Sequence, residues 1–295
     1  MAGKAKDSAM GNYFNLVGLM KSRRKVAVLF SGGKDSCLVA KAAIDAGIET
    51  AAFTISSPLF SRKELKNSEK MAKEIGIQHI VIKSDYIPKN DNRRCYRCKK
   101  NMIKLVRGSA KSKGFDILAD GTTIDDMKDE TRIGTKAADE EGIWHPLLDA
   151  GFNEKEVISA SSSIGLSVWN KPSNSCIATR ISYGEEITAK KIDMVEKAEE
   201  FLQNSLGETK RIRVRVHGGI ARIEVPAEDF EKILEMRDEI IERFKKIGFT
   251  YTALDLSGYR SGSMNEELGQ LWGKPLKQHH SHDRNNAEYG NRLRH

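Results

Sequence analysis

A glycine-rich loop near the start of the chain combines the residue types that hold phosphate. Ser31-Gly32-Gly33-Lys34-Asp35-Ser36 follows the apolar run at 26–30 and precedes a helix-forming stretch. Strand, tight turn and helix in this order gather backbone N–H groups at a helix N-terminus, where phosphates bind. The glycines allow the sharp turn and a close approach to the backbone. Lys34 adds positive charge, Ser31 and Ser36 add hydroxyl donors, and Asp35 is a natural Mg²⁺ ligand beside a polyphosphate.

The residue order in this loop differs from the common P-loop. A Walker loop needs glycine, four residues, and then Gly-Lys-Ser/Thr, whereas Asp35 follows Lys34 here and the upstream glycine is missing. The loop instead resembles the S-G-G-x-D-S signature of the PP-loop ATP pyrophosphatases. These enzymes hold the β- and γ-phosphates of ATP and leave the α-phosphorus open to a substrate oxygen. The resemblance implies adenylation with pyrophosphate release, ATP binding by residues 31–36, and a catalytic, Mg²⁺-positioning role for Asp35.

A second polar loop is expected beside the first. Residues 120–126, D-G-T-T-I-D-D, follow a predicted strand, and Arg132 comes shortly after them. This stretch resembles the second motif of adenylating enzymes of the same class, which implies that Arg132 helps to bind ATP. The alternative is a polar loop followed by an exposed helix start.

Three of the four cysteines indicate a metal centre or redox chemistry. Cys95 and Cys98 form a C-x-x-C motif in an arginine-rich segment, Cys176 lies in a distant polar loop, and Cys37 lies among apolar residues. Cys37 is therefore predicted to be a core residue. A disulfide is the least expected state of the C-x-x-C motif in a cytosolic chain. A thioredoxin-like pair would open a helix after a strand, without so many basic neighbours.

Three thiolates favour a 4Fe-4S cluster over structural zinc. Zinc would need a fourth protein ligand, and the histidines at 79, 145 and 217 show no diagnostic spacing. A cluster bound by Cys95, Cys98 and Cys176 would leave one iron open to an external ligand such as hydrosulfide. Zinc and three unrelated thiols remain the alternatives.

The first part of the chain alternates strands and helices. Strands are predicted over 25–30, 50–55, 79–82 and 115–119, and helices over 13–21, 35–45, 62–75 and 98–113. This alternation predicts an α/β fold with a parallel sheet flanked by helices. Ligands bind at the carboxyl ends of the strands in such a fold, where Ser31, Ser56 and Asp120 begin polar loops.

The character of the sequence changes near Pro172. The residues that follow predict a smaller α+β module. Its predicted elements are a helix over 188–204, a hairpin turning at Gly218-Gly219, a helix over 227–247 and a strand over 251–256. Arg213 and Arg215 alternate with apolar residues and so share one strand face, as an anion clamp requires. A solvated strand face is the alternative. Glu224 and Asp229 are weaker candidates for a metal ligand or a subunit contact.

The predicted domains are a PP-loop ATP pyrophosphatase domain over 1–170, a substrate and sulfur-transfer domain over 171–264, and a tail over 265–295. The tail lacks apolar periodicity, and we expect it to be disordered or vector-derived, so its histidines are not counted as ligands.

The composition is that of an ordinary soluble protein. The 295 residues are 39% hydrophobic and 31% charged, with a net charge of +8. No apolar run approaches the ~20 residues of a membrane span, and residues 1–10 do not resemble a signal peptide. We therefore expect a cytoplasmic protein without a membrane partner. The positive charge suits nucleic acid or a small polyanion and does not choose between them.

Three blocks in fixed order resemble one family. They are the S-G-G-x-D-S loop, the P-x-x-x-C-x-x-x-R pattern from Pro172 to Arg180, and the R-V-R-V-H…A-R-I-E-V block from Arg213 to Val225. In these three blocks the chain resembles the LarE family. Members are ATP-dependent sulfur transferases that make the nickel-pincer nucleotide cofactor of lactate racemase. The resemblance runs from about residue 13 to residue 264 and implies an adenine nucleotide α-hydrolase-like fold.

The resemblance also implies a reaction. A carboxylate of pyridinium-3,5-biscarboxylic acid mononucleotide would be adenylated and then converted to a thiocarboxylate. Arg180, Arg213 and Arg215 would bind the phosphate or carboxylates of this small-molecule substrate. Relatives suggest a homo-oligomer, with a hexamer as one form.

The cysteines place the chain within the family. In the sacrificial branch, a lone cysteine matching Cys176 donates its own sulfur, whereas this chain adds Cys95 and Cys98. It therefore resembles the iron–sulfur branch, in which a 4Fe-4S cluster carries sulfur supplied by sulfide or another donor. The main rival is a tRNA thiolase, which also pairs a PP-loop with three cysteines. Missing terminal zinc-finger cysteines and the block over 213–225 argue against that rival, and a non-catalytic nucleotide-binding module is a second alternative.

Overall fold

The computed structural model describes residues 2–129, 132–171, 175–207 and 211–268. Pro172, which begins the second sequence block, and the predicted tail from residue 269 onward lie outside the described residues. The predicted domain boundary at 170 and 171 therefore stays a prediction. Within the described ranges, no helix has the length and apolar character needed to cross a membrane.

The first sheet is parallel throughout and has the strand order β3-β2-β1-β4. Its strands are β1 (Lys25–Leu29), β2 (Glu49–Ser56), β3 (Gln78–Lys83) and β4 (Ile117–Ala119). The four predicted strands are confirmed, with ends shifted by one or two residues. The central strands are apolar on both faces because helices cover both sides of the sheet.

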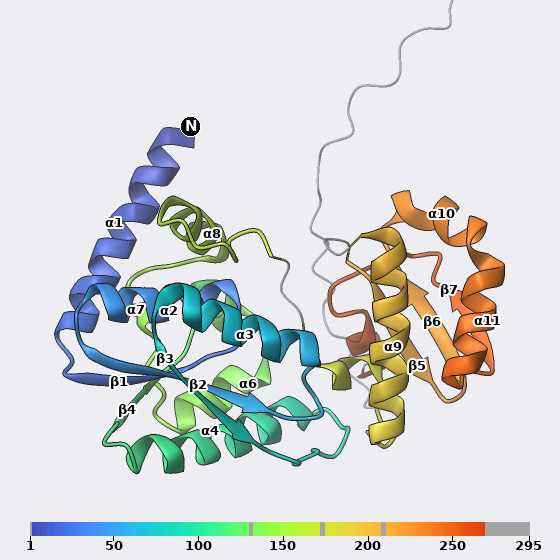
Figure 1. Cartoon of the computed structure of the whole chain (residues 1–295), viewed down its shortest axis with the longest axis horizontal. Coiled ribbons are helices and arrows are strands. Elements are labelled where there is room, and N and C mark those ends of the chain that lie inside the picture. Colours follow the sequence, from blue (N-terminus) through green and yellow to red (C-terminus); the bar gives the residue numbers. More distant parts are fainter. Residues whose placement is uncertain (1, 130–131, 172–174, 208–210, 269–295) are drawn as a thin grey trace, which may run out of the picture.

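Helices form a layer on each side of this sheet (Figure 1). They are α1 (Ala2–Lys21), α2 (Lys34–Asp45), α3 (Arg62–Ile75), α4 (Arg94–Lys111), α5 (Ile124–Lys128), α6 (Ile133–Glu140), α7 (Pro146–Asp149) and α8 (Glu154–Ser163). One core joins α1, α2 and α8 to the sheet, and a second core joins α4 and α6 to its other face. The predicted helix over 98–113 begins four residues earlier, at Arg94, so Cys95 and Cys98 lie at the start of α4.

A second sheet forms the smaller module, in the order β5-β6-β7. Strands β5 (Arg213–His217) and β6 (Ile220–Glu224) form the predicted antiparallel hairpin, and β7 (Tyr251–Leu254) pairs in parallel with β6. The helix α9 (Ala189–Leu206) packs on this sheet, as do α10 (Phe230–Glu235) and α11 (Arg237–Ile247). Short 3-10 turns lie at η1 (Ile177–Arg180), η2 (Ala227–Asp229) and η3 (Ser263–Asn265).

The single helix predicted over 227–247 is wrong. Met236 leaves helical geometry, with φ −88° and ψ 6°, and separates α10 from α11. The break lets α10 bury Ile233 while α11 buries Ile240 and Phe244 in the same core. Burial of both apolar faces outweighs helix continuity here, and the apolar spacing alone does not reveal the break.

The segment around Cys176 is held by both modules. The Ile177 amide donates to the Leu59 carbonyl oxygen at 2.9 Å, which ties the segment to the first module. Ile181 forms a β-bridge with Val216 of β5. The buried Asn90 amide donates to the carbonyl oxygen of Ser182 at 2.8 Å. Cys176 therefore occupies a loop whose backbone is fixed from two sides.

Candidate active site

The glycine-rich loop lies at the carboxyl end of β1 and opens α2. Gly32 has a φ of +72°, and a Cβ there would lie 2.6 Å from the Ser68 Cα of α3, so only glycine fits. The Ser31 hydroxyl accepts from the Gly33 amide at 3.2 Å and lies 3.2 Å from the Ser36 hydroxyl. The loop is thus compact before any ligand binds, with its serine hydroxyls turned toward its own backbone.

Lys34 and Asp35 lie among carboxylates. Lys34 is 7% exposed, and its Nζ lies 2.8 Å from Glu154 Oε1 of α8. The pKa of Asp35 is raised to about 6, chiefly by burial and also by the charges of Asp126 and Glu154, while Lys34 opposes the shift. Crowded carboxylates that resist ionisation favour a bound cation, as expected for Mg²⁺ beside polyphosphate.

The second polar loop packs against the first. A Cβ on Gly121, two residues after the end of β4, would lie 2.8 Å from the Asp35 Cβ, so the two loops are in contact. Asp126 forms the capping box of α5 with Thr123. Arg132 forms an ion pair with Asp126, the carboxylate that acts on Asp35. The structure therefore brings Arg132 into the surroundings of the ATP loop, while its role in binding ATP stays a prediction.

A buried network that the sequence did not indicate starts from Asp120. Lys99 Nζ lies 2.8 Å from Asp120 Oδ2, and His145 Nδ1 lies 2.7 Å from Asp120 Oδ1. His145 Nε2 lies 3.0 Å from Asp139 Oδ1. Burial alone would raise the pKa of Asp120, but Lys99 and His145 hold it well below its usual range. Because Lys99 follows Cys98, this network connects the cysteine turn of α4 with the edge of the sheet that carries the ATP loop.

The structure gathers the three candidate cysteines. Cys95 is exposed and Cys98 is half-buried at the start of α4, while Cys176 is half-buried and precedes η1. The pKa of Cys98 is raised to about 12, chiefly by burial and also by the charges of Cys176 and Cys95. Burial also raises the pKa of Cys176, with a contribution from Cys95. Cys37 is fully buried, which confirms its place in the core.

Zinc and a 4Fe-4S cluster make different demands on the arrangement of their ligands. Among the described residues, no three His, Cys, Asp or Glu side chains are placed to hold one ion. His79 bonds to the Thr54 hydroxyl at 2.7 Å and His217 to the Ser182 hydroxyl at 2.6 Å. Zinc needs its thiolates within about 2.3 Å of one ion, whereas thiolates of a 4Fe-4S cluster bind different irons and lie farther apart. The cluster itself stays a prediction.

Arginines hold the backbone around Cys176. Arg180 Nη1 donates to the carbonyl oxygens of Ser175 at 2.8 Å and Cys176 at 3.1 Å. Arg94 donates to the Ala178 carbonyl at 3.0 Å and Arg215 to the Thr179 carbonyl at 3.1 Å. Arg94 was not among the predicted site residues, since its position before Cys95 suggested only a basic surface.

Two of the predicted substrate arginines are paired inside the protein. Arg180 binds both carboxylate oxygens of Glu199, at 2.8 and 3.1 Å. Arg215 binds Glu224 Oε2 through two nitrogens, at 3.0 and 2.7 Å. Glu224 is therefore an internal counter-ion. The alternative of a solvated strand face is wrong, because Arg213 and Arg215 are only 7% and 5% exposed.

Arg213 differs from its two neighbours. Its guanidinium donates to the Ile212 carbonyl at 2.7 Å and lies 5.5 Å from the Tyr259 ring centroid. Within the described part of the chain, no carboxylate forms an ion pair with it. Burial and the charge of Arg180 lower its pKa. A buried cation without a carboxylate partner is expected to attract an anion.

Comparison with known proteins identifies the family. The family model described as asparagine synthase matches residues 17–88, which span the ATP loop. An uncharacterized protein of Synechocystis is 36% identical over 83% of this chain and 93% of its own length. The pyridinium-3,5-bisthiocarboxylic acid mononucleotide synthase of Lactiplantibacillus plantarum is 34% identical over 86% of this chain and 93% of its own length. The chain belongs to the LarE family. It is an ATP-dependent sulfur transferase with the predicted PP-loop fold, and both predictions are confirmed at this level.

Proposed function

We propose that this LarE protein adenylates a carboxylate of pyridinium-3,5-biscarboxylic acid mononucleotide and converts it to a thiocarboxylate. The observation that carries the proposal is the buried Arg213, whose lack of a carboxylate partner among the described residues fits an anionic substrate. The printed name of the Lactiplantibacillus relative supports the choice of substrate. A tRNA thiolase remains the alternative, because its PP-loop and three cysteines would be the same.

ATP activation is assigned to the loop over 31–36. Its backbone N–H groups and the hydroxyls of Ser31 and Ser36 would hold the β- and γ-phosphates. Lys34 would exchange Glu154 for a phosphate oxygen, since a phosphate carries more charge than one carboxylate. Asp35 would position Mg²⁺, and Arg132 would balance charge at the outer side of the site.

Sulfur delivery is assigned to Cys95, Cys98 and Cys176. When bound by these three thiolates, a 4Fe-4S cluster supplies an iron with an open coordination position for sulfide. The arginines at 94, 180 and 215 hold the carbonyl oxygens of 175–179 and so fix the position of the Cys176 thiol. Arg213 would bind the phosphate or the second carboxylate of the substrate, with Arg180 and Arg215 adding positive charge beside it.

A substrate comparison tests the reaction. Anaerobically purified protein would be mixed with ATP, Mg²⁺ and sulfide, and with the dicarboxylated pyridinium nucleotide, tRNA or no acceptor. We expect pyrophosphate release and a thiocarboxylate product by mass spectrometry only with the pyridinium nucleotide. Thiolated tRNA would instead support the alternative, and ATP binding without pyrophosphate release in every arm would exclude both.

Reconstitution tests the cluster. Anaerobic loading with iron and sulfide is expected to give a 4Fe-4S absorption spectrum that is lost in Cys95→Ser, Cys98→Ser and Cys176→Ser. Cys37→Ala is the matched control, because this thiol lies in the core, and it should keep the spectrum. One equivalent of zinc without a chromophore would overturn the cluster.

The homo-oligomer and the cytoplasmic location also belong to this proposal. Light scattering after size-exclusion chromatography would test the oligomer. A monomer at micromolar concentration would contradict it.

A further inference from the structure

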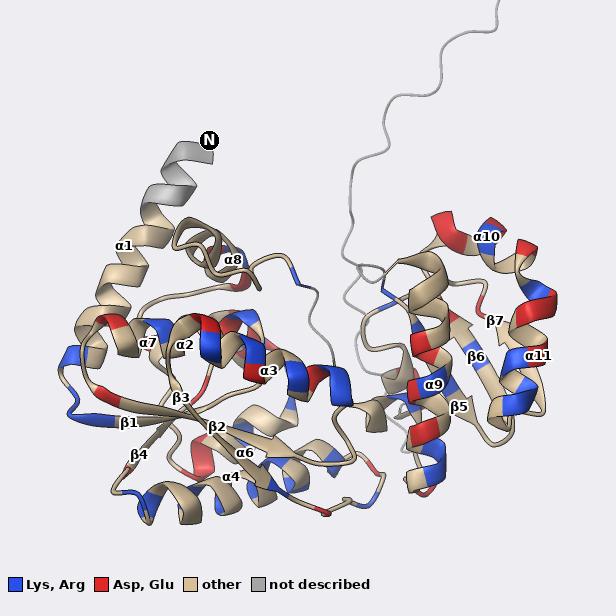
Figure 2. Cartoon of the chain, in the orientation of Figure 1, with Lys and Arg blue, Asp and Glu red and all other residues tan. Residues whose placement is uncertain are grey.

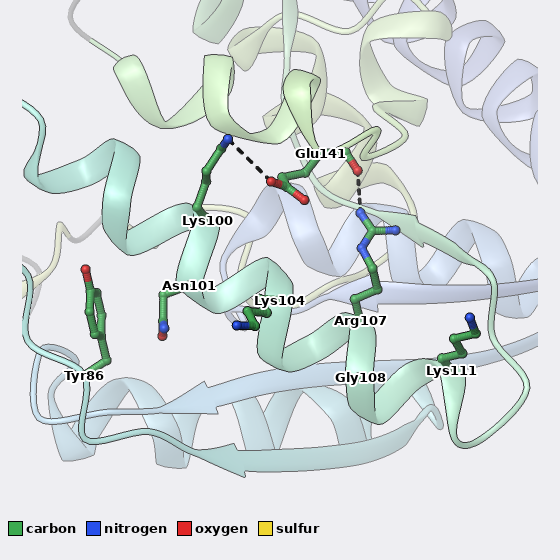
Figure 3. A pocket seen from close by; sticks show the side chains of 8 residues that line it. All are labelled: Tyr86, Lys100, Asn101, Lys104, Arg107, Gly108, Lys111 and Glu141. Carbon is green, nitrogen blue, oxygen red and sulfur yellow. Dashed lines mark hydrogen bonds and ion pairs between the residues drawn. The ribbon is translucent and has the colours of Figure 1, made fainter.

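The helix α4 carries positive charge along its whole length. It has Lys or Arg at positions 94, 97, 99, 100, 104, 107 and 111 and no acidic residue. Lys100, Lys104, Arg107 and Lys111 are spaced by four, three and four residues and therefore lie along one side of the helix (Figure 2). Together with Tyr86, they line a groove of about 540 Å³ (Figure 3).

Part of this charge is not neutralised by the protein. Lys100 pairs with Glu140 at 2.9 Å, and Arg107 donates to the backbone oxygen of Glu141. Lys104 and Lys111 are exposed, and neither forms an ion pair within the described ranges. Seven residues of helix separate them, or about 10 Å at 1.5 Å per residue. Two cations at this distance can bind two carboxylates of one extended chain.

Tyr86 lines the other side of the groove, and the segment that carries it follows the edge strand β3. Tyr86 follows β3, and Figure 3 shows its ring across from the α4 side chains. Val81, Tyr86 and Ile87 are 41%, 36% and 37% exposed. In the described sheet β3 pairs only with β2, so its outer backbone groups are available. A polypeptide can pair with such a strand edge through its backbone N–H and C=O groups, which a nucleic acid cannot do.

We propose that the groove between α4 and the segment after β3 binds an extended acidic segment of a partner protein. Its carboxylates would pair with Lys104 and Lys111, and its apolar side chains would cover Tyr86. The exposed Cys95 lies near the start of the same helix, so a partner bound here would lie beside the cysteine site. The proposal concerns binding only and does not depend on the reaction proposed above.

Peptide binding to the full-length protein tests this site. Fluorescence anisotropy would follow a labelled peptide of alternating glutamate and valine at low ionic strength, with the glutamine analogue as peptide control. The variant Lys104→Glu/Lys111→Glu reverses the two unpaired charges. The matched control Lys232→Glu/Lys245→Glu makes the same charge change at exposed lysines of α10 and α11. Circular dichroism would verify the fold of both.

We expect the acidic peptide to bind and the glutamine peptide to fail. The α4 variant should lose about ten-fold or more in affinity, because like charges then face each other across the interface. The control variant should bind as the wild type does. If both variants lower the affinity for the peptide equally, binding depends on net charge alone, and the proposed binding site is wrong. Tighter binding of a single-stranded oligouridylate, weakened only by the α4 variant, would make the groove a nucleic-acid site, and absence of peptide binding would also refute the proposal.

Discussion

The ATP loop and the cysteine site are built in opposite ways. The ATP loop is six consecutive residues on one turn, and its neighbours Asp126 and Glu154 make it rich in carboxylates. The cysteine site is assembled from residues 94–98, 175–180 and 213–224, and its surroundings are rich in arginine. Carboxylates therefore surround the first region and guanidinium groups the second.

This difference assigns different roles to buried charge. The surroundings of Asp35 disfavour its charged form, so the ionised carboxylate lowers the stability of the folded protein. A bound cation would offset this cost. Arg180 and Arg215 are paired with Glu199 and Glu224 and so belong to the scaffold. Arg213 is the exception in the second region: within the described residues no carboxylate forms an ion pair with it, and burial and Arg180 lower its pKa although the charge of Glu199 opposes them.

The largest effect is expected at Asp35. Asp35→Ala should abolish pyrophosphate release, because the loop loses the carboxylate that positions Mg²⁺. Its raised folded-state pKa means that the ionised group costs stability above about pH 6. The variant should therefore unfold at the same temperature as the wild type or higher at pH 8. Calorimetry and a pyrophosphate assay measure the two effects, with Asp116→Ala at an exposed position as control. Full pyrophosphate release by Asp35→Ala would refute the catalytic role.

Replacing Arg215 should destabilise the fold, whereas replacing Asp35 should not. Arg215→Ala removes the guanidinium that binds Oε2 of the fully buried Glu224 through two nitrogens, while Arg222 remains 3.3 Å from Oε1. The substitution should therefore cost about 3 kcal/mol in the free energy of unfolding, the low end for breaking a buried ion pair. Urea unfolding measures this change. The double variant Arg215→Met/Glu224→Leu should recover most of the loss, since it removes both charges. If Arg215→Ala is as stable as the wild type but binds substrate weakly, the arginine is a ligand contact and the contrast with Arg213 is wrong.

Arg213 should affect binding more than folding. Arg213→Ala should lower the affinity for the pyridinium nucleotide by about ten- to a hundred-fold. This corresponds to the loss of a charge-assisted contact worth about 1.5–3 kcal/mol. ATP binding should be unchanged. Arg211→Ala is the matched control, because Arg211 is exposed and also lies over Tyr259, at 5.8 Å. Titrations with both ligands separate the cases, and equal weakening of ATP would indicate a structural role.

The first region was predictable because its information is local. The strand, the two glycines and the helix follow one another, and the structure places them as expected. The Lys34 contact with Glu154 was not predictable, since it joins α2 to α8 across the sheet edge. The same holds for the network from Lys99 to Asp120 and His145, which depends on how α4 packs beside β4.

The second region was predictable in its residues but not in its pairing. Alternation placed Arg213 and Arg215 on one face, yet it could not show that Glu224, which lies opposite Arg213 in the strand register, forms its ion pair with Arg215. One clue was available for Glu199. It lies four residues after Val195 and three before Leu202, on the apolar face of α9. A charged residue at such a position needs a buried partner, which is Arg180.

The smallest effect concerns the network that links the two regions. Burial lowers the pKa of His145, but Asp120 and Asp139 outweigh it and raise the pKa above its ordinary 6.5. The charged imidazole therefore stabilises the fold fully below pH 6.5, and this contribution is lost as the pH rises through the raised pKa. The unfolding temperatures of the wild type and of His145→Asn should thus differ most near pH 6, and the difference should shrink toward pH 9. His217→Asn is the control, because burial and Arg222 lower the pKa of His217. A difference for His145→Asn that grows with pH would show that the neutral imidazole is the stabilising form.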